Sequence, residues 1–233
     1  MNTSGLFAAA LLLVTIANVG TVFAGSEPEP IVHRATRPAP IQDRCYQCHK
    51  STGKSFVDEV ITITGQNKEY LINQLYRYRS GERQERLIHY MNTIAGKLTD
   101  DEIERLAAFF SAQNPRILYE TPIEFEKMTE NDRRLYEIGK THAVVCLSCH
   151  ADAETSPPKR SDWPYISGQN RPALAIQLYA FAKGKRVAPE MAFLQSPPFN
   201  DPDVIEGLAL YFSRLQPPGE EPPPPPPQRR RRR

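Results

Sequence analysis

Apolar side chains recur at helical spacing in several segments of the chain. Leu71, Leu75 and Tyr76 fall on one face of a predicted helix. Two later segments each form one apolar face, made by Ile103, Leu106, Phe109 and Phe110 in the first and by Ile205, Leu208, Ala209 and Phe212 in the second. No segment shows the alternation of apolar and polar residues that is typical of strands. The pattern predicts an all-α protein.

The two later segments also carry signals for a helix N-terminus. Thr99 is followed three residues later by Glu102, which predicts a capping box. Asp201 can cap a helix whose first residue is Pro202. A further helix is predicted before residue 146, with Leu135, Ile138 and Val145 on one side. The corresponding segment before residue 45 contains Pro38 and Pro40, which exclude a long helix there.

The chain contains a second copy of part of itself. The segment TGQNKEYLINQLYRYRSGER, residues 64–83, aligns with SGQNRPALAIQLYAFAKGKR, residues 167–186, at a constant separation of 103 residues. We therefore predict two homologous helical domains, at 41–113 and 129–216, joined by a linker at 114–128. They are called the first and second repeat below.

Both ends of the chain differ from the repeats. Residues 6–24 are uncharged and end in Val-Phe-Ala, which predicts a signal peptide at 1–24 or, alternatively, an uncleaved anchor, followed by a proline-rich leader at 25–40. Either reading exports the rest of the chain from the cytoplasm, and no second segment is apolar enough to cross a bilayer. We expect a periplasmic protein, soluble or membrane-associated.

Residues 217–233 form a tail of prolines and five terminal arginines. Net charge is +2, so the rest of the chain sums to −3 and is no basic nucleic-acid binder. Six prolines give a stiff spacer of about 19 Å. The tail is interpreted either as a solvated, disordered end or as a tether to anionic lipid or to an acidic face of a partner.

The four cysteines make two Cys-x-x-Cys-His motifs at equivalent points of the repeats. The motifs are Cys45, Cys48 and His49, and Cys146, Cys149 and His150. This pattern is the attachment signature of c-type haem. Two thiols one helical turn apart can each add to a haem vinyl group, and the next residue then places an imidazole against the iron. The sequence predicts two covalently bound haem c groups.

Three other uses of the cysteines compete with haem. Two disulfides would leave the histidines unexplained. A zinc site would need further ligands near each pair, and the sequence supplies none at the usual spacing. A redox dithiol belongs in a βαβ setting, which the helical pattern does not provide.

Methionine is the usual second axial ligand of such haems. Met91 and Met191 lie 42 and 41 residues after their histidines and match in the repeat, whereas Met128 has no partner. We predict Met91 and Met191 as the ligands, with a core-filling role as the alternative. His89 is a rival for the first haem.

Other repeated residues have weaker predicted roles. Arg83 and Arg186 are candidates to pair with haem propionates, with a solvated arginine at a helix end as the alternative. Tyr76 and Tyr179 are candidate pocket residues or ordinary core aromatics. Trp163 is expected near the second haem.

The ordered set of motifs, CxxCH, GQ, QL with an aromatic, GxR and Met, occurring twice, resembles the dihaem cytochrome c4 family. The resemblance covers about 41–215 and implies two cytochrome c domains in tandem, each a small helical bundle around a His/Met haem. It implies an electron carrier, not an enzyme, that serves redox partners such as a terminal oxidase or another membrane complex. Lys50 and Ala151 depart from the family's usual glycine, and Ile61 stands where the second repeat keeps Pro164. The lack of a full N-terminal helix implies a more exposed first haem.

Three alternatives keep part of this interpretation. The chain could be the dihaem electron-transfer subunit of a periplasmic oxidoreductase complex, such as the cytochrome partner of a flavin-dependent sulfide dehydrogenase. It could be a dihaem peroxidase, with one haem open to peroxide. It could also be a zinc-bound or disulfide-bonded adaptor.

Overall fold

The computed structural model describes residues 40–53, 57–84, 90–118, 124–150 and 157–219. All regular elements within these ranges are helices, so the predicted fold class is confirmed for them. The α-helices are α1 (Asp43–His49), α2 (Lys68–Ser80), α3 (Tyr90–Ala95), α4 (Asp100–Ser111), α5 (Glu130–His150), α6 (Arg171–Ala182) and α7 (Pro202–Arg214). The 3-10 helices are η1 (Pro115–Leu118), η2 (Phe125–Lys127) and η3 (Pro189–Gln195).

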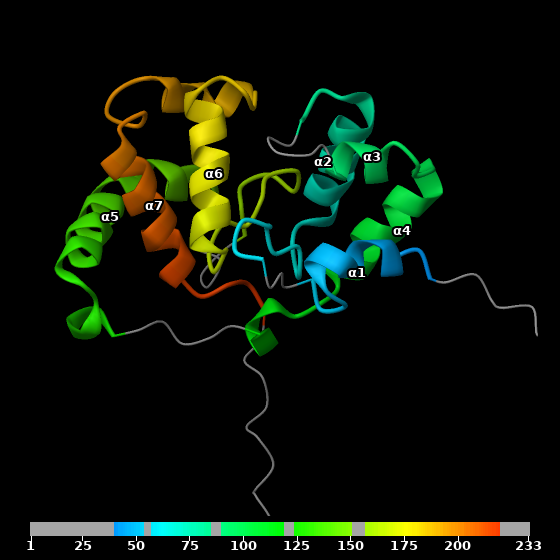
Figure 1. Cartoon of the computed structure of the whole chain (residues 1–233), viewed down its shortest axis with the longest axis horizontal. Coiled ribbons are helices and arrows are strands. Elements are labelled where there is room, and N and C mark those ends of the chain that lie inside the picture. The colour runs from blue at the N-terminus through cyan, green and yellow to red at the C-terminus, as the bar shows by residue number, and fades with distance from the viewer. Residues whose placement is uncertain (1–39, 54–56, 85–89, 119–123, 151–156, 220–233) are drawn as a thin grey trace, which may run out of the picture. The chain divides into compact units, whose positions relative to one another are not determined.

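In the first repeat, α2 packs against α3 and α4 (Figure 1). The buried core contains Leu71 from α2 and Ile103, Leu106 and Phe110 from α4. Helix α4 begins with the predicted capping box, in which Thr99 Oγ1 accepts from the Glu102 N–H at 3.2 Å and the Glu102 carboxylate accepts from the Thr99 N–H at 2.9 Å. The cap satisfies two backbone donors at this helix start.

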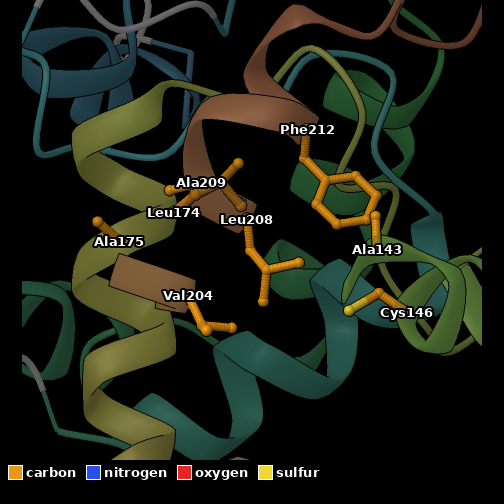
Figure 2. Packing of buried hydrophobic residues seen from close by; sticks show 8 residues of the cluster. All are labelled: Ala143, Cys146, Leu174, Ala175, Val204, Leu208, Ala209 and Phe212. Carbon is orange, nitrogen blue, oxygen red and sulfur yellow. The ribbon is translucent and has the colours of Figure 1, made fainter. Parts of the chain in front are cut away.

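In the second repeat, α7 packs along α5 and against α6. Figure 2 shows residues of α7 between those of α6 on one side and those of α5 on the other. Asp201 caps α7 by accepting from the Asp203 N–H at 2.8 Å, and Pro202 is the first helical residue, as predicted. The predicted face of α7 is confirmed, since all four of its residues are buried.

Helices α5 and α7 cross at two glycines. A Cβ built on Gly139 would lie 1.9 Å from the Gly207 carbonyl oxygen, and one on Gly207 would lie 2.5 Å from the Leu135 carbonyl oxygen. The two backbones are in direct contact here, so any side chain would force the helices apart. The crossing fixes α5, and with it the cysteine motif at the end of α5.

Two details of the predicted helix faces were wrong. Val145 is 43% exposed, although Leu135 is buried on the same helix. Ten residues of helix rotate by 1000°, which places Val145 about 80° away from Leu135. The buried stripe instead runs through Gly139, Ala143 and Cys146. Phe109 is 36% exposed and lies at the rim of its core, in edge contact with Phe110.

The described residues belong to one compact unit, within which the main helix pairs each lie inside a single repeat. The exact domain and linker boundaries stay predictions. Among the described residues, no helix is both long enough and apolar enough to cross a bilayer. The predicted signal peptide, most of the leader, residues 220–233 of the tail, and His89 lie outside the described residues.

Candidate haem sites and the contact between the repeats

Each Cys-x-x-Cys-His motif lies at the C-terminal end of a helix. His49 is the last residue of α1 and His150 the last residue of α5, and both are buried. The helix places the two cysteines of each motif one turn apart. The first cysteine faces the core in both repeats, since Cys45 packs against the first core and Cys146 belongs to the second (Figure 2).

A backbone carbonyl orients each histidine. His49 Nδ1 lies 3.0 Å from the Ile61 carbonyl oxygen, and His150 Nδ1 lies 2.9 Å from the Pro164 carbonyl oxygen. A carbonyl can only accept, so Nδ1 carries the proton and Nε2 keeps its lone pair. That is the tautomer an iron ligand needs. The replacement of proline by Ile61 preserves the hydrogen bond.

The environment keeps His150 neutral. Burial lowers the pKa of His150 and Arg186 acts in the same direction, while the hydrogen bond to Pro164 opposes them. A neutral imidazole is the form that binds a metal.

None of the four cysteines is in a disulfide. Burial raises the pKa of Cys45 to about 11 and that of Cys146 to about 12. A redox dithiol needs a thiol of lowered pKa, because the thiolate is the nucleophile. The pKa shifts therefore oppose the dithiol interpretation.

The three methionines in the described ranges differ in their surroundings. Met128 is buried with Leu135 and Leu210 and fills a small core. Met91 in α3 and Met191 in η3 are half-buried, and neither belongs to the hydrophobic clusters of the described residues. The two methionines predicted as ligands are therefore the two that do not serve as core residues.

Arg83 and Arg186 meet between the repeats and are not solvated helix ends. Arg83 is 3% exposed and donates to Gln74 Oε1 at 2.6 Å and to Gln177 Oε1 at 2.9 Å. Arg186 donates to Gln177 Oε1 at 2.7 Å, Tyr70 Oη at 3.0 Å and Gln74 Oε1 at 3.2 Å. These oxygens belong to neutral side chains, and the buried Nε of Arg186 has no hydrogen-bond partner.

This cluster, here called the arginine cluster (Tyr70, Gln74, Arg83, Gln177 and Arg186), carries two neighbouring positive charges. Burial lowers the pKa of Arg186, and the charge of Arg83 lowers it further. Burial would raise the pKa of Tyr70, but Arg186 and Arg83 outweigh burial and lower it. Two buried like charges are costly, so the cluster suits a nearby anion.

The predicted aromatic residues lie beside the cores. Tyr76 and Tyr179 are half-buried and pack against the first and second core respectively. The Trp163 ring lies 6.4 Å from the His150 ring, centroid to centroid, and Arg160 stacks over it at 5.3 Å. Trp163 is therefore near the second histidine, as expected if a haem binds there.

The GQN segments have a role that the sequence did not reveal. Gln66 and Gln169 are buried, and each bonds to the backbone of the other repeat. Asn67 and Asn170 also reach across, donating to the Trp163 carbonyl at 2.5 Å and to the Val60 carbonyl at 3.0 Å. An identical triplet in both repeats was the available signal. Periodicity alone could not distinguish a contact between repeats from a turn within each.

Comparisons with known proteins agree with this geometry. No protein-family model matches the chain. A cytochrome c4 of Azotobacter vinelandii is 28% identical over 151 residues, covering 61% of this chain and 69% of that protein. Cytochrome c-554(548) of Halomonas halodenitrificans is 32% identical over 69 residues, covering 30% of this chain and 83% of that protein.

Two solved structures share the fold. Acidithiobacillus ferrooxidans cytochrome c4 has a TM-score of 0.59 and 25% identity, covering 74% of this chain and 99% of that chain. Thiosulfate dehydrogenase from Marichromatium purpuratum has a TM-score of 0.57 and 24% identity, covering 74% of this chain and 36% of that chain.

In each helical repeat, a helix ends with the Cys-x-x-Cys-His motif, and the histidine is oriented to bind a metal. This combination defines a c-type cytochrome. The comparisons are more specific. They support the dihaem cytochrome c4 family, and the chain is an electron-transfer protein with two covalently bound haem c groups.

Proposed function

We propose that the protein is a periplasmic carrier that shuttles single electrons between a respiratory donor and an acceptor such as a terminal oxidase. The observation that carries the proposal is the pair of equivalent histidines, each held by a carbonyl with Nε2 available. The similarity to cytochrome c4 proteins supports the electron-transfer class. The predicted leader supports export, since c-type haem attachment occurs outside the cytoplasm.

The predicted haem-binding residues would have the same roles in each repeat. Thioether bonds at Cys45 and Cys48, and at Cys146 and Cys149, would hold the haems. His49 and His150 would each supply one axial ligand through Nε2. Met91 and Met191 would supply the opposite ligand, which leaves the metal no open position for a substrate. When bound, each haem would supply one-electron redox chemistry.

The arginine cluster would hold haem propionates. Two guanidinium groups with neutral hydrogen-bond partners lie together, and Arg186 Nε is buried with a proton to donate. A carboxylate accepts such donors readily and would offset the cost of burying the charges. Because the cluster contains residues from both repeats, propionates there would bring the two haems close enough for electrons to pass between them.

The tail suits association with an anionic surface. Five consecutive arginines on a proline spacer would attract anionic lipid or an acidic partner face over about a Debye length, roughly 8 Å at physiological salt. The attraction would raise the association rate and weaken as salt increases.

A second candidate is the electron-transfer subunit of a larger oxidoreductase. The fold likeness to thiosulfate dehydrogenase favours it, since the chain covers only part of that protein. The two candidates share the haem chemistry and differ in assembly. A stable complex with a catalytic protein, copurified from periplasm, would favour the second.

Replacement of the methionines tests the carrier function. Met91→Ala and Met191→Ala should each remove about half of the red methionine-to-iron charge-transfer absorption of the oxidised protein. Met128→Ala is the matched control, because Met128 is a core residue. Spectra unchanged in the first two variants would contradict the proposed ligation.

A further inference from the structure

Residue contacts between the repeats converge on the peptide groups that orient the histidines. The carbonyl of Ile61 and the N–H of Thr62 belong to one peptide group. Its carbonyl accepts from His49 Nδ1 at 3.0 Å, and its N–H donates to Gln169 Oε1 at 2.6 Å. Gln169 Nε2 also donates to the Thr62 carbonyl at 2.8 Å. A glutamine of the second repeat thus clamps the peptide that orients the first histidine.

The second repeat shows the same arrangement. The carbonyl of Pro164 accepts from His150 Nδ1 at 2.9 Å, and the N–H of the same peptide, on Tyr165, donates to Gln66 Oε1 at 2.8 Å. Gln66 Nε2 donates to the Tyr165 carbonyl at 2.9 Å. The two clamps are equivalent in the repeat alignment, so the contact is reciprocal.

Hydrogen bonds in such a chain polarise one another. An acceptor on the peptide N–H makes the carbonyl of that peptide a better acceptor. A better acceptor draws the Nδ1 proton more strongly and raises the basicity of the imidazole as a ligand. A more basic ligand favours ferric over ferrous iron and lowers the reduction potential. The glutamine amide therefore acts on the iron through one peptide and one imidazole.

We propose that Gln66 and Gln169 are crossed positioning residues: each lowers the reduction potential of the haem in the other repeat. The sequence position alone would suggest an effect on the haem of the same repeat, because each glutamine precedes a helix of its own repeat. The hydrogen bonds place the effect on the other haem instead. The inference rests on the proposed ligation of haem by His49 and His150. It assigns a function to the GQN triplet that haem binding alone does not require.

The test uses Gln66→Leu and Gln169→Leu in the full-length protein with both haems, followed by optical redox titration. Gln169→Leu should raise the potential of the first haem and leave the second unchanged, and Gln66→Leu should do the reverse. A neutral hydrogen bond acting through two others should change the reduction equilibrium by at most about tenfold, which is about 59 mV for one electron. Met91→His and Met191→His, each lowering one potential strongly, assign the two waves.

Two further sets of variants separate this effect from general loosening. Asn67→Ser and Asn170→Ser remove other hydrogen bonds between the repeats, to the Trp163 and Val60 carbonyls, and keep a good helix-capping residue. Both should leave the two potentials unchanged. Gln66→Glu and Gln169→Glu retain an acceptor oxygen and should not raise the potential of the opposite haem, which also covers the case in which a leucine variant fails to fold.

The Nδ1–H resonances of the axial histidines give an independent readout. In the reduced protein labelled with ¹⁵N-histidine, Gln169→Leu should move the His49 Nδ1–H signal upfield, as its hydrogen bond weakens, without moving that of His150. The inference would be overturned if the reduction potential of the haem in the same repeat changed instead, or if both potentials changed equally. It would also be overturned if neither potential changed in a folded two-haem protein. Protein without two haems would instead contradict the proposed function.

Discussion

The two repeats share a motif order but frame their helices differently. In the second repeat, the 21-residue α5 crosses α7 at Gly207, with the two backbones in contact. In the first repeat, α1 has only seven residues, and the position equivalent to Gly207 is Arg105, which is exposed. Glycine is required only where a second helix approaches. At this one position, the residue type therefore depends on whether another helix packs there: glycine where α5 is in contact, and arginine where the position is exposed.

The two cysteine motifs are held in place by different amounts of helix packing. The second motif is anchored by a long helix packed along α7, whereas the first is anchored by a single short helix and by the core around Leu71 and Phe110. We expect the first repeat to depend more on its haem for stability, because a small helical domain has little other apolar area to bury.

Loss of a haem gives the largest expected effect. Cys45→Ala with Cys48→Ala should yield protein with one haem and should reduce the helical signal in circular dichroism markedly. Cys146→Ala with Cys149→Ala should also remove one haem but should retain more helix, because α5 and α7 still pack. An equal loss of helix in both variants would contradict the proposed difference between the repeats.

Substitution at the helix crossing comes next. Gly207→Ala should destabilise the protein by about 3 kcal/mol, because its Cβ would lie 2.5 Å from the Leu135 carbonyl oxygen and the helices must separate. Arg105→Ala, at the equivalent exposed position, should change the free energy of unfolding by less than about 0.5 kcal/mol. Chemical denaturation measures both. Similar values for the two variants would show that the crossing is not as close as described.

Replacement of Lys50 is expected to stabilise the protein. It directly follows the first motif and has φ 59° and ψ 168°, a conformation that glycine adopts readily and other residues rarely do. Lys50→Gly should therefore stabilise the protein by about 1 kcal/mol. Lys50→Ala is the control and should give no gain, because alanine has the same backbone restriction. Thermal unfolding of the two variants separates relief of strain from loss of the lysine charge.

The smallest effect concerns an exposed ion pair in the second repeat. Arg134 donates to both oxygens of Asp203, at 2.6 and 3.2 Å, and this hydrogen bonding lowers the pKa of Asp203. The pair therefore contributes at neutral pH, and its contribution is lost as the pH falls through the lowered pKa. Arg134→Ala should return the pKa towards the ordinary value for aspartate, as followed by NMR. Arg134→Lys should keep only part of the lowering of the Asp203 pKa, because lysine cannot donate to both carboxylate oxygens in the bidentate geometry of arginine.

The sequence allowed accurate prediction wherever a local rule applied. The caps at Thr99 and Asp201, the helical class and the family follow from short motifs and their repetition. The wrong assignment of Val145 arose because three apolar residues do not define a helix face when their spacing drifts. The crossed contacts of Gln66 and Gln169 could not be predicted, because a hydrogen bond between residues about one hundred positions apart leaves no periodic trace.

Counting haems and electrons on the exported, full-length protein decides whether it is a two-site carrier. Intact-mass spectrometry with tryptic mapping, followed by coulometric reduction of the same sample, should show two covalent haems, one on each Cys-x-x-Cys-His motif, and two electrons taken up per chain. A chain with no haem, with one haem, or with two haems that accept fewer than two electrons would contradict the assignment.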